Sequence, residues 1–149
     1  MNKNLQRWML RFINIWPPFV GAGIRVTRRT PDMKAVDVEM KLHFFNRNYV
    51  GTHYGGSLYS MTDPFYMLML MHNLGADYIV WDKAASIRFR KPGKGRVRAE
   101  FRLSDARLDD IRLKLTNQDR CEATFAVEVK DETGEVVAEV QKLLYIRRR

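Results

Sequence analysis

The residues best suited to chemistry lie in one short stretch near the middle of the chain. Asp63 stands among apolar residues, eight positions after Gly55, the first of two adjacent glycines, Gly55 and Gly56. A carboxylate in apolar surroundings is costly unless it is paired or used. Backbone amides of glycines that open a helix can stabilise developing negative charge. The pattern favours an acid with an oxyanion hole, although two glycines also make simple turns, and local hydroxyls or solvent can satisfy a carboxylate.

Other polar residues add a loop amide but no metal site. Asn48 precedes the glycines, and its amide can orient a water or a carbonyl, although an asparagine in a loop often only forms a turn. The three histidines, His43, His53 and His72, and the single cysteine, Cys121, lack the spacing of metal ligands. We therefore expect neither a metal nor another cofactor.

The segment that carries Asp63 is apolar on nearly every side. A helix over residues 55–73 has to be buried, and Pro64 within it predicts a bend, because proline removes one backbone hydrogen bond. Its methionines alternatively suit an adaptable binding surface.

Segments of alternating apolar and polar residues flank this helix and predict strands. They cover residues 24–26, 36–42, 87–89, 97–103, 123–129 and 136–146. No helix is expected between the late strands, which should form antiparallel hairpins. The fold class is therefore α+β, a curved antiparallel sheet wrapped around one long central helix.

The N-terminus carries its own helical pattern. Apolar residues at helical spacing predict an amphipathic helix over residues 3–15, ended by Pro17 and Pro18. We divide the chain into this N-terminal amphipathic helix, residues 1–18, and a single domain, residues 19–149. A basic helix with tryptophan can also lie on a membrane surface, so peripheral membrane contact is a minor alternative. With no transmembrane segment or signal pattern and one thiol, we expect a cytoplasmic protein.

The charge balance favours an anionic partner. Among 149 residues, 26 are basic and 17 acidic, a net charge of +9. Arg88, Arg90, Lys91 and Lys94 cluster around one glycine-rich turn, either as a phosphate clamp or as a solvated basic face. Nucleic acid is not expected as a partner, because the basic strands lack the interleaved aromatic residues that stack bases.

The spacing of these residues resembles a known family. The run from Asn48 to Asp63 reads Asn-x-x-Gly-Thr-x-x-Gly-Gly-x-Leu-x-x-x-x-Asp, and an Arg-x-Arg-Lys-Pro-Gly-x-Gly turn follows from Arg88. Together they resemble the hotdog-fold acyl-CoA thioesterases, in the phenylacetyl-CoA thioesterase branch and its tetrameric acyl-CoA thioesterase-like relatives. The resemblance covers roughly residues 20–146 and implies the hotdog fold.

The resemblance also implies roles for single residues. Asp63 falls on the family's catalytic aspartate, a nucleophile or general base, and Gly55, with Gly56 beside it, on the amide that polarises the thioester carbonyl. Asn48 falls on the residue that helps place the attacking water. Tyr54 stands where the family has histidine, and a tyrosine does not exchange a proton near neutrality as an imidazole does. The adjacent His53 is a candidate to compensate as a substrate-binding residue.

Asp82 falls near a position where relatives carry a hydroxyl residue that holds the water. If Asp63 and Asp82 face one pocket, their pKa values should be driven apart. A surface pair with Lys83 is the simpler interpretation.

The resemblance implies an acyl-CoA substrate and a homodimer, with dimers pairing further in many members. The predicted function is metal-independent thioester hydrolysis in lipid metabolism. The alternative is a non-catalytic acyl-CoA or lipid binding protein on the same scaffold, which the loss of the histidine favours. A dehydratase would need His53 as its catalytic histidine.

Overall fold

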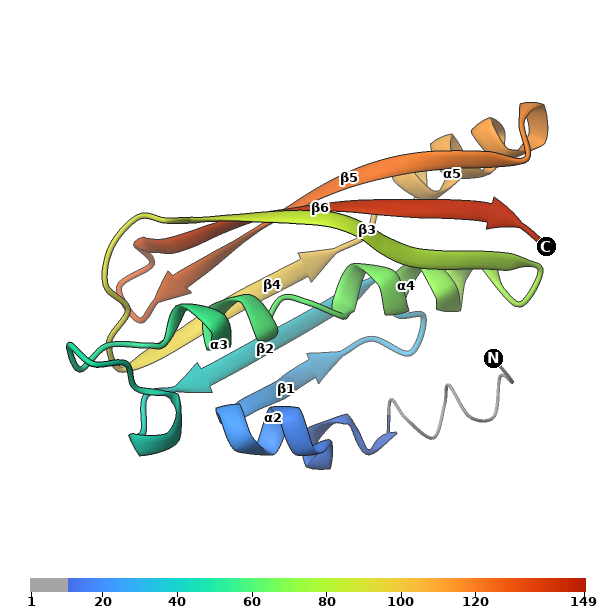
Figure 1. The fold of residues 1–149 in the computed structure, drawn as a ribbon. Helices are drawn as coiled ribbons and strands as arrows, with labels where there is room; N and C mark the ends of the chain where they lie inside the picture. Colours follow the sequence, from blue (N-terminus) through green and yellow to red (C-terminus); the bar gives the residue numbers. More distant parts are fainter. Residues whose placement is uncertain (1–10) are drawn as a thin grey trace.

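The core of the protein is a curved, six-stranded antiparallel sheet (Figure 1). The computed structural model describes residues 11–149. The strands lie in the order β1-β2-β4-β5-β6-β3. They are β1 (Ile24–Arg29), β2 (Ala35–Lys41), β3 (Tyr78–Phe89), β4 (Arg96–Arg102), β5 (Arg120–Asp131) and β6 (Val136–Arg148). Every predicted strand segment lies on one of these strands, and β3 begins nine residues earlier than predicted.

The apolar central segment lies against one face of the sheet, as predicted, but as two helices. These are α3 (Gly55–Ser60) and α4 (Phe65–Leu74). Met61 and Met69 are fully buried, so the methionines on this side form core rather than a binding surface. The apolar face of the helices and the alternate residues of the strands share one hydrophobic core.

The bend predicted at Pro64 is a complete break of the helix. Residues 61–64 form turns, and Pro64 caps the start of α4. Proline has no amide hydrogen to donate, so the hydrogen-bond ladder stops here. Asp63 consequently lies in the break between α3 and α4 and not inside a continuous helix. The direction of its side chain is therefore not set by the face of a helix.

The prediction of uninterrupted late hairpins was wrong. A helix, α5 (Asp105–Asn117), separates β4 from β5 and packs on the core through Leu108, Ile111 and Leu115. The Ser104 side chain caps its start by accepting from the Arg107 amide. In addition, β3 crosses to the far edge of the sheet and pairs with β6. Direct hairpins therefore join only β1 to β2 and β5 to β6 in the described residues.

The N-terminal region differs from its prediction where it is described. Residues 3–10 of the expected amphipathic helix lie outside the described residues, and Ile13–Ile15 form a short 3₁₀ turn, η1. Pro17 and Pro18 begin the helix α2 (Pro17–Ala22) instead of only ending one. Proline suits the first turn of a helix because its missing amide hydrogen has no partner there in any case. Phe19 of α2 packs against Phe65 of α4.

The loop before α3 contains a second 3₁₀ turn, η2 (Phe44–Asn46). Within residues 11–149, no helix has both the length and the apolar character needed to cross a membrane. The observed layers, one curved antiparallel sheet and a central helical segment, confirm the predicted fold class.

Candidate active site

Asp63 belongs to a cluster of charged and polar side chains between the helix break and the sheet. Its Oδ1 accepts hydrogen bonds from Lys142 Nζ at 2.9 Å and from the Tyr59 hydroxyl at 2.9 Å. Lys142 also donates to the Tyr59 oxygen at 3.1 Å and lies 3.1 Å from Asp82 Oδ1. The cluster thus joins α3, the break, β3 and β6 around one ammonium group.

Burial sets the electrostatics of this cluster. Burial raises the pKa of Asp82, and the Lys142 charge opposes part of that rise. Burial alone would lower the pKa of Lys142, but the hydrogen bonds that it donates to Asp63 and Tyr59 and the two carboxylate charges outweigh burial, so the pKa lies above its usual value. Burial is also the main reason that the pKa of Tyr59 is raised.

The prediction that Asp82 and Lys83 form a surface pair was wrong. Lys83 pairs with Glu122 of β5, whereas Asp82 turns toward Lys142. Asp82 Oδ1 is buried and close enough to Lys142 for an ion pair, although it is not aligned for a hydrogen bond. Asp63 and Asp82 therefore face one cation, whereas the alternative considered from the sequence was that both acids face one pocket.

A small cleft opens beside Asp63. Its volume is about 120 Å³, and Trp16, Pro18 and Phe19 form one wall while Tyr59, Ser60, Asp63 and Pro64 form the other. The Asp63 side chain is 48% exposed, which leaves a part of the carboxylate accessible from this side. The cleft thus sets an accessible acid against an apolar wall contributed by the N-terminal part of the chain.

The start of α3 offers two backbone donors. Within residues 11–149, neither the Gly55 nor the Gly56 amide has a hydrogen-bond acceptor. A Cβ at Gly55 would lie 2.9 Å from the Phe89 ring, and one at Gly56 would lie 2.5 Å from the Tyr54 ring. A larger residue at either position would have to displace one of these exposed rings, and both amides remain free to donate.

Tyr54 and His53 point to different surroundings. Tyr54 is 59% exposed, with its ring over Gly56, beside the free amides. His53 is buried, and its Nε2 donates to the Gly95 carbonyl oxygen at 3.0 Å, which fixes the proton on that nitrogen. Burial lowers the pKa of His53, so the ring is neutral near pH 7. A buried neutral ring facing the Gly93 and Gly95 turn gives no support to a dehydratase or to the predicted contact between His53 and substrate.

Asn48 uses its side chain to hold the loop before α3. Its Oδ1 accepts from the Val50 and Thr52 amides, and its Nδ2 donates to Thr52 Oγ1 and the His53 carbonyl oxygen. Both ends of the amide are thereby engaged within residues 48–53. Its predicted role in placing a water stays a prediction, and the structure shows a turn-forming asparagine.

The basic cluster around the 92–95 turn is partly neutralised. Arg90 pairs with Glu139 at 2.7 Å, and Lys91 pairs with Asp131 and Glu135. For Arg88 and Lys94, no acidic side chain among residues 11–149 lies within ion-pair distance. Of the four predicted phosphate contacts, these two lack a direct ion pair among the described residues, although Arg88 lies opposite Glu139 on β6.

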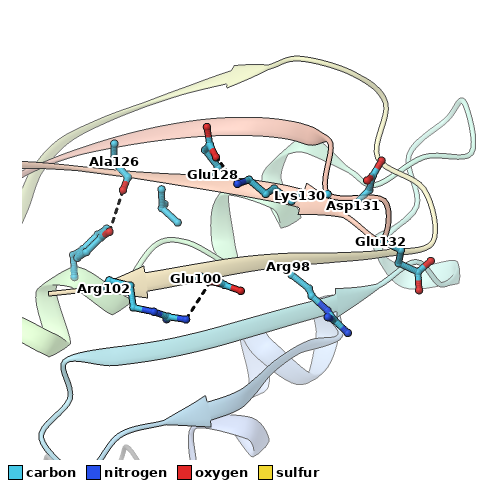
Figure 2. Close-up of a pocket in the computed structure, with 11 residues that line it drawn as sticks. Arg98, Glu100, Arg102, Ala126, Glu128, Lys130, Asp131 and Glu132 are labelled. Atoms are coloured by element: carbon cyan, nitrogen blue, oxygen red, sulfur yellow. Dashed lines mark hydrogen bonds and ion pairs between the residues drawn. The ribbon is translucent and has the colours of Figure 1, made fainter.

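A larger cleft of about 690 Å³ lies where β4 and β5 separate, shown in Figure 2. The Tyr66 hydroxyl spans the gap by donating to the Ala126 carbonyl oxygen at 3.0 Å. Two ion pairs lie along it, Arg102 with Glu100 and Lys130 with Glu128. Its lining also includes Asp131 and Glu132, so these acidic side chains make the cleft a poor site for a coenzyme phosphate.

The sequence interpretation missed Lys142, although the sequence contains a signal for it. Alternate residues of β6 face the core, namely Ala138, Val140, Lys142, Leu144 and Ile146. A lysine in that series has to be buried by the period of the strand. In the described part of the chain, no group of histidine, cysteine, aspartate and glutamate side chains is arranged to hold a metal ion.

Solved structures with the same architecture place this chain in a structural class. A protein of unknown function from Pseudomonas aeruginosa, described as a probable thioesterase, matches with a TM-score of 0.84 and 25% identity over 100% of this chain and 97% of that chain. A thioesterase from Haemophilus influenzae gives 0.69 and 12% over 93% and 88% of the two chains. A mutant of the phenylacetic acid degradation protein PaaI from Thermus thermophilus gives 0.61 and 21% over 87% and 98%. The chain thus has the hotdog fold of thioesterase-type structures.

The family follows from the sequence itself. The family model described as a domain of unknown function, DUF4442, matches residues 3–146, so the chain belongs to this family. Among curated proteins, no relative matches the sequence.

Proposed function

We propose that the protein is a thioesterase that hydrolyses acyl-CoA, with Asp63 as the catalytic carboxylate. The observation that carries this proposal is the position of Asp63, half-exposed at a small cleft and held by hydrogen bonds from Tyr59 and Lys142 to one carboxylate oxygen. The similarity to a probable thioesterase at 25% identity over the whole chain supports it.

Thioester hydrolysis suits this set of groups. A carboxylate either attacks the acyl carbon or activates a water for that attack, and backbone amides stabilise the oxyanion that forms. The leaving thiolate needs little assistance because a thiol is far more acidic than an alcohol, with a pKa of about 8.5 for a cysteine-like thiol. Gly55 and Gly56 supply amides that are free to donate, and the ring of the exposed Tyr54 lies next to Gly56.

The geometry favours a site shared between two subunits. Gly55 opens α3, and Asp63 lies beyond the other end of that helix, in the break before α4. Six helical residues span about 9 Å at 1.5 Å per residue, so the amides and the acid of one chain are poorly placed to act on one carbonyl. The edge strand β3 has an exposed middle, residues 83–86, and can pair with another strand. We infer a homodimer in which the acid of one subunit works with the amides of the other.

A substrate panel with a matched variant tests the hydrolase. Purified protein is incubated with CoA esters of short, long and aromatic acyl groups, and thiol release is followed with a colorimetric reagent. Asp63→Asn should lower kcat by about 10²–10⁴-fold, the usual contribution of a general base. Asp109→Asn is the control, because Asp109 pairs with Arg112 on the exposed face of α5.

Two other outcomes contradict the proposal. Thiol release that survives in Asp63→Asn removes Asp63 from the reaction. Tight binding of CoA esters by the wild type without release identifies a non-catalytic binder, the function that Tyr54 in place of the family's histidine would favour.

Arg88 and Lys94 are the proposed contacts for the coenzyme phosphates. Replacing either by alanine should raise KM for acyl-CoA by several fold with little change in kcat, and this loss should shrink at high salt. Arg90 and Lys91 provide the contrast, because their acidic partners already compensate them. An equal loss from all four alanine variants would contradict this division.

A further inference from the structure

Lys142 is a charge that the proposed reaction does not use directly. Its side chain is 0% exposed, and it lies on β6 opposite Ala85 of β3 and Phe125 of β5. Directly opposed residues of antiparallel strands point to the same face, so its neighbours across the sheet are small or aromatic. A buried ammonium in such surroundings is costly unless it is paired. The position therefore needs a reason beyond packing.

We propose that Lys142 is a positioning residue of the candidate site, which fixes the Asp63 carboxylate in the helix break and supplies the positive charge that compensates both Asp63 and a second carboxylate, Asp82. This inference rests on the proposed function, since Asp63 is the group whose position Lys142 sets. Lys142 and Tyr59 both donate to Oδ1 of Asp63 at 2.9 Å. Only one of the two carboxylate oxygens is used in this way, which leaves Oδ2 for the cleft.

The charges around the ammonium support a role in ionisation. The titratable groups that face it are Tyr59 from α3, Asp63 from the break and Asp82 from β3, while β5 contributes the neutral Phe125. One cation therefore serves two carboxylates. Two carboxylates in one site without a compensating charge do not both stay ionised, so loss of Lys142 should cause one of them to take up a proton near neutral pH.

The first test measures this coupling without reference to activity. Protein labelled with ¹⁵N-lysine gives side-chain ammonium resonances, and the Lys142 signal is identified by its loss in Lys142→Met. Asp63→Asn and Asp82→Asn should each shift that signal, whereas Lys130→Met, on the outer surface with Glu128, should leave it in place. A Lys142 resonance that ignores Asp63→Asn would overturn the proposal.

The second test measures the consequence for catalysis. Lys142→Met should lower kcat at least tenfold with KM within about threefold, and should move the acidic limb of the kcat/KM profile upward by about 1–3 pH units, the range for loss of an adjacent opposite charge. Lys142→Arg should restore part of kcat. Lys130→Met serves as the control with unchanged kinetics.

A folding defect does not remove the test. In Lys142→Met/Asp82→Asn one carboxylate leaves with the cation, so no like-charge pair remains, and this double variant should fold and show a smaller upward shift of the acidic limb than Lys142→Met. A folded Lys142→Met with wild-type kcat and pH profile would overturn the proposal. Wild-type protein that releases no thiol would refute the proposed hydrolysis, and the ammonium resonances would still decide whether Lys142 holds Asp63.

Discussion

Tyr59→Phe isolates one part of the buried cluster without changing its volume. The substitution removes only the hydroxyl, which donates to Asp63 at 2.9 Å and accepts from Lys142 at 3.1 Å. The ring stays, and with it the contact between the Lys142 ammonium and the ring face, 5.1 Å from its centre. Any change in the free energy of unfolding therefore reports on the hydroxyl.

The expected loss follows from those two hydrogen bonds. Hydrogen bonds to charged groups contribute about 1.5–3 kcal/mol each. Asp63 is half-exposed and gains water in exchange, and Lys142 keeps its 2.9 Å bond to Asp63, so the two losses do not add in full. We expect a decrease of about 1–2 kcal/mol, equivalent to roughly 2–8 °C in Tm for a domain of this size.

Urea unfolding of wild type and variant at neutral pH measures this loss, through the midpoint at constant slope. Tyr54→Phe is the matched control, since Tyr54 is largely exposed, and its effect should be below about 0.5 kcal/mol. If Tyr59→Phe costs no more than Tyr54→Phe, the hydroxyl does not hold the cluster together and the reasoning is refuted. A double-mutant cycle with Lys142→Met should then also show no coupling.

Three further predictions concern pH, packing and the cleft. Burial raises the pKa of Asp82 in the folded protein, so its proton stabilises the fold at acid pH and that contribution is lost as pH rises through the raised pKa. Urea unfolding from about pH 4 to about pH 8 should show the free energy of unfolding of Asp82→Asn rising relative to that of the wild type as pH increases. A difference between the two free energies that does not change with pH would contradict this. Gly93→Ala should cost about 1–3 kcal/mol in the same assay, because its Cβ would lie 2.9 Å from Val137, whereas Gly21→Ala in α2 meets nothing within 4 Å and should not destabilise. Given the proposed hydrolysis, Trp16→Ala should widen the cleft beside Asp63. The ratio of kcat/KM for longer acyl esters to kcat/KM for shorter ones should then rise by about tenfold, the usual effect of a changed apolar pocket. An unchanged ratio would place the acyl group elsewhere.

The strands and the buried central segment could be predicted from the sequence because their periods are strong. Alternation of apolar and charged residues locates β2, β4 and β5, whose buried positions alternate strictly, apart from the half-buried last residue of β5. The helix α5 was missed because its sequence is mostly charged, and its apolar residues occupy a narrow stripe at positions 108, 111 and 115. A serine cap precedes that stripe and is the signal that would have identified it.

The sequence predicted the acid of the candidate site, Asp63, but not the residues that surround it. Asp63 stands out because its neighbours in sequence are apolar, but its partners Tyr59, Asp82 and Lys142 come from three separate elements. Sequence spacing cannot relate β6 to the helix break, since the pairing of distant segments depends on the fold. The side chain of Asn48 shows the opposite case, because its contacts are all within five residues and follow from the local turn.

The divergence of β4 and β5 has a consequence for how the sheet opens. Residues 97–99 pair with residues 129–131, and beyond them the two strands part around the hydroxyl of Tyr66. The strands β1, β2 and β4 thus form one half of the sheet, and β5, β6 and β3 form the other. The seam between the halves is the short pairing of residues 97–99 with residues 129–131. Amide hydrogens on either side of the seam should exchange with solvent by local separation of the two halves, at a lower free energy than global unfolding. Interior amides of the long β5 and β6 hairpin, paired along nearly its whole length, should by contrast exchange only when the entire molecule unfolds.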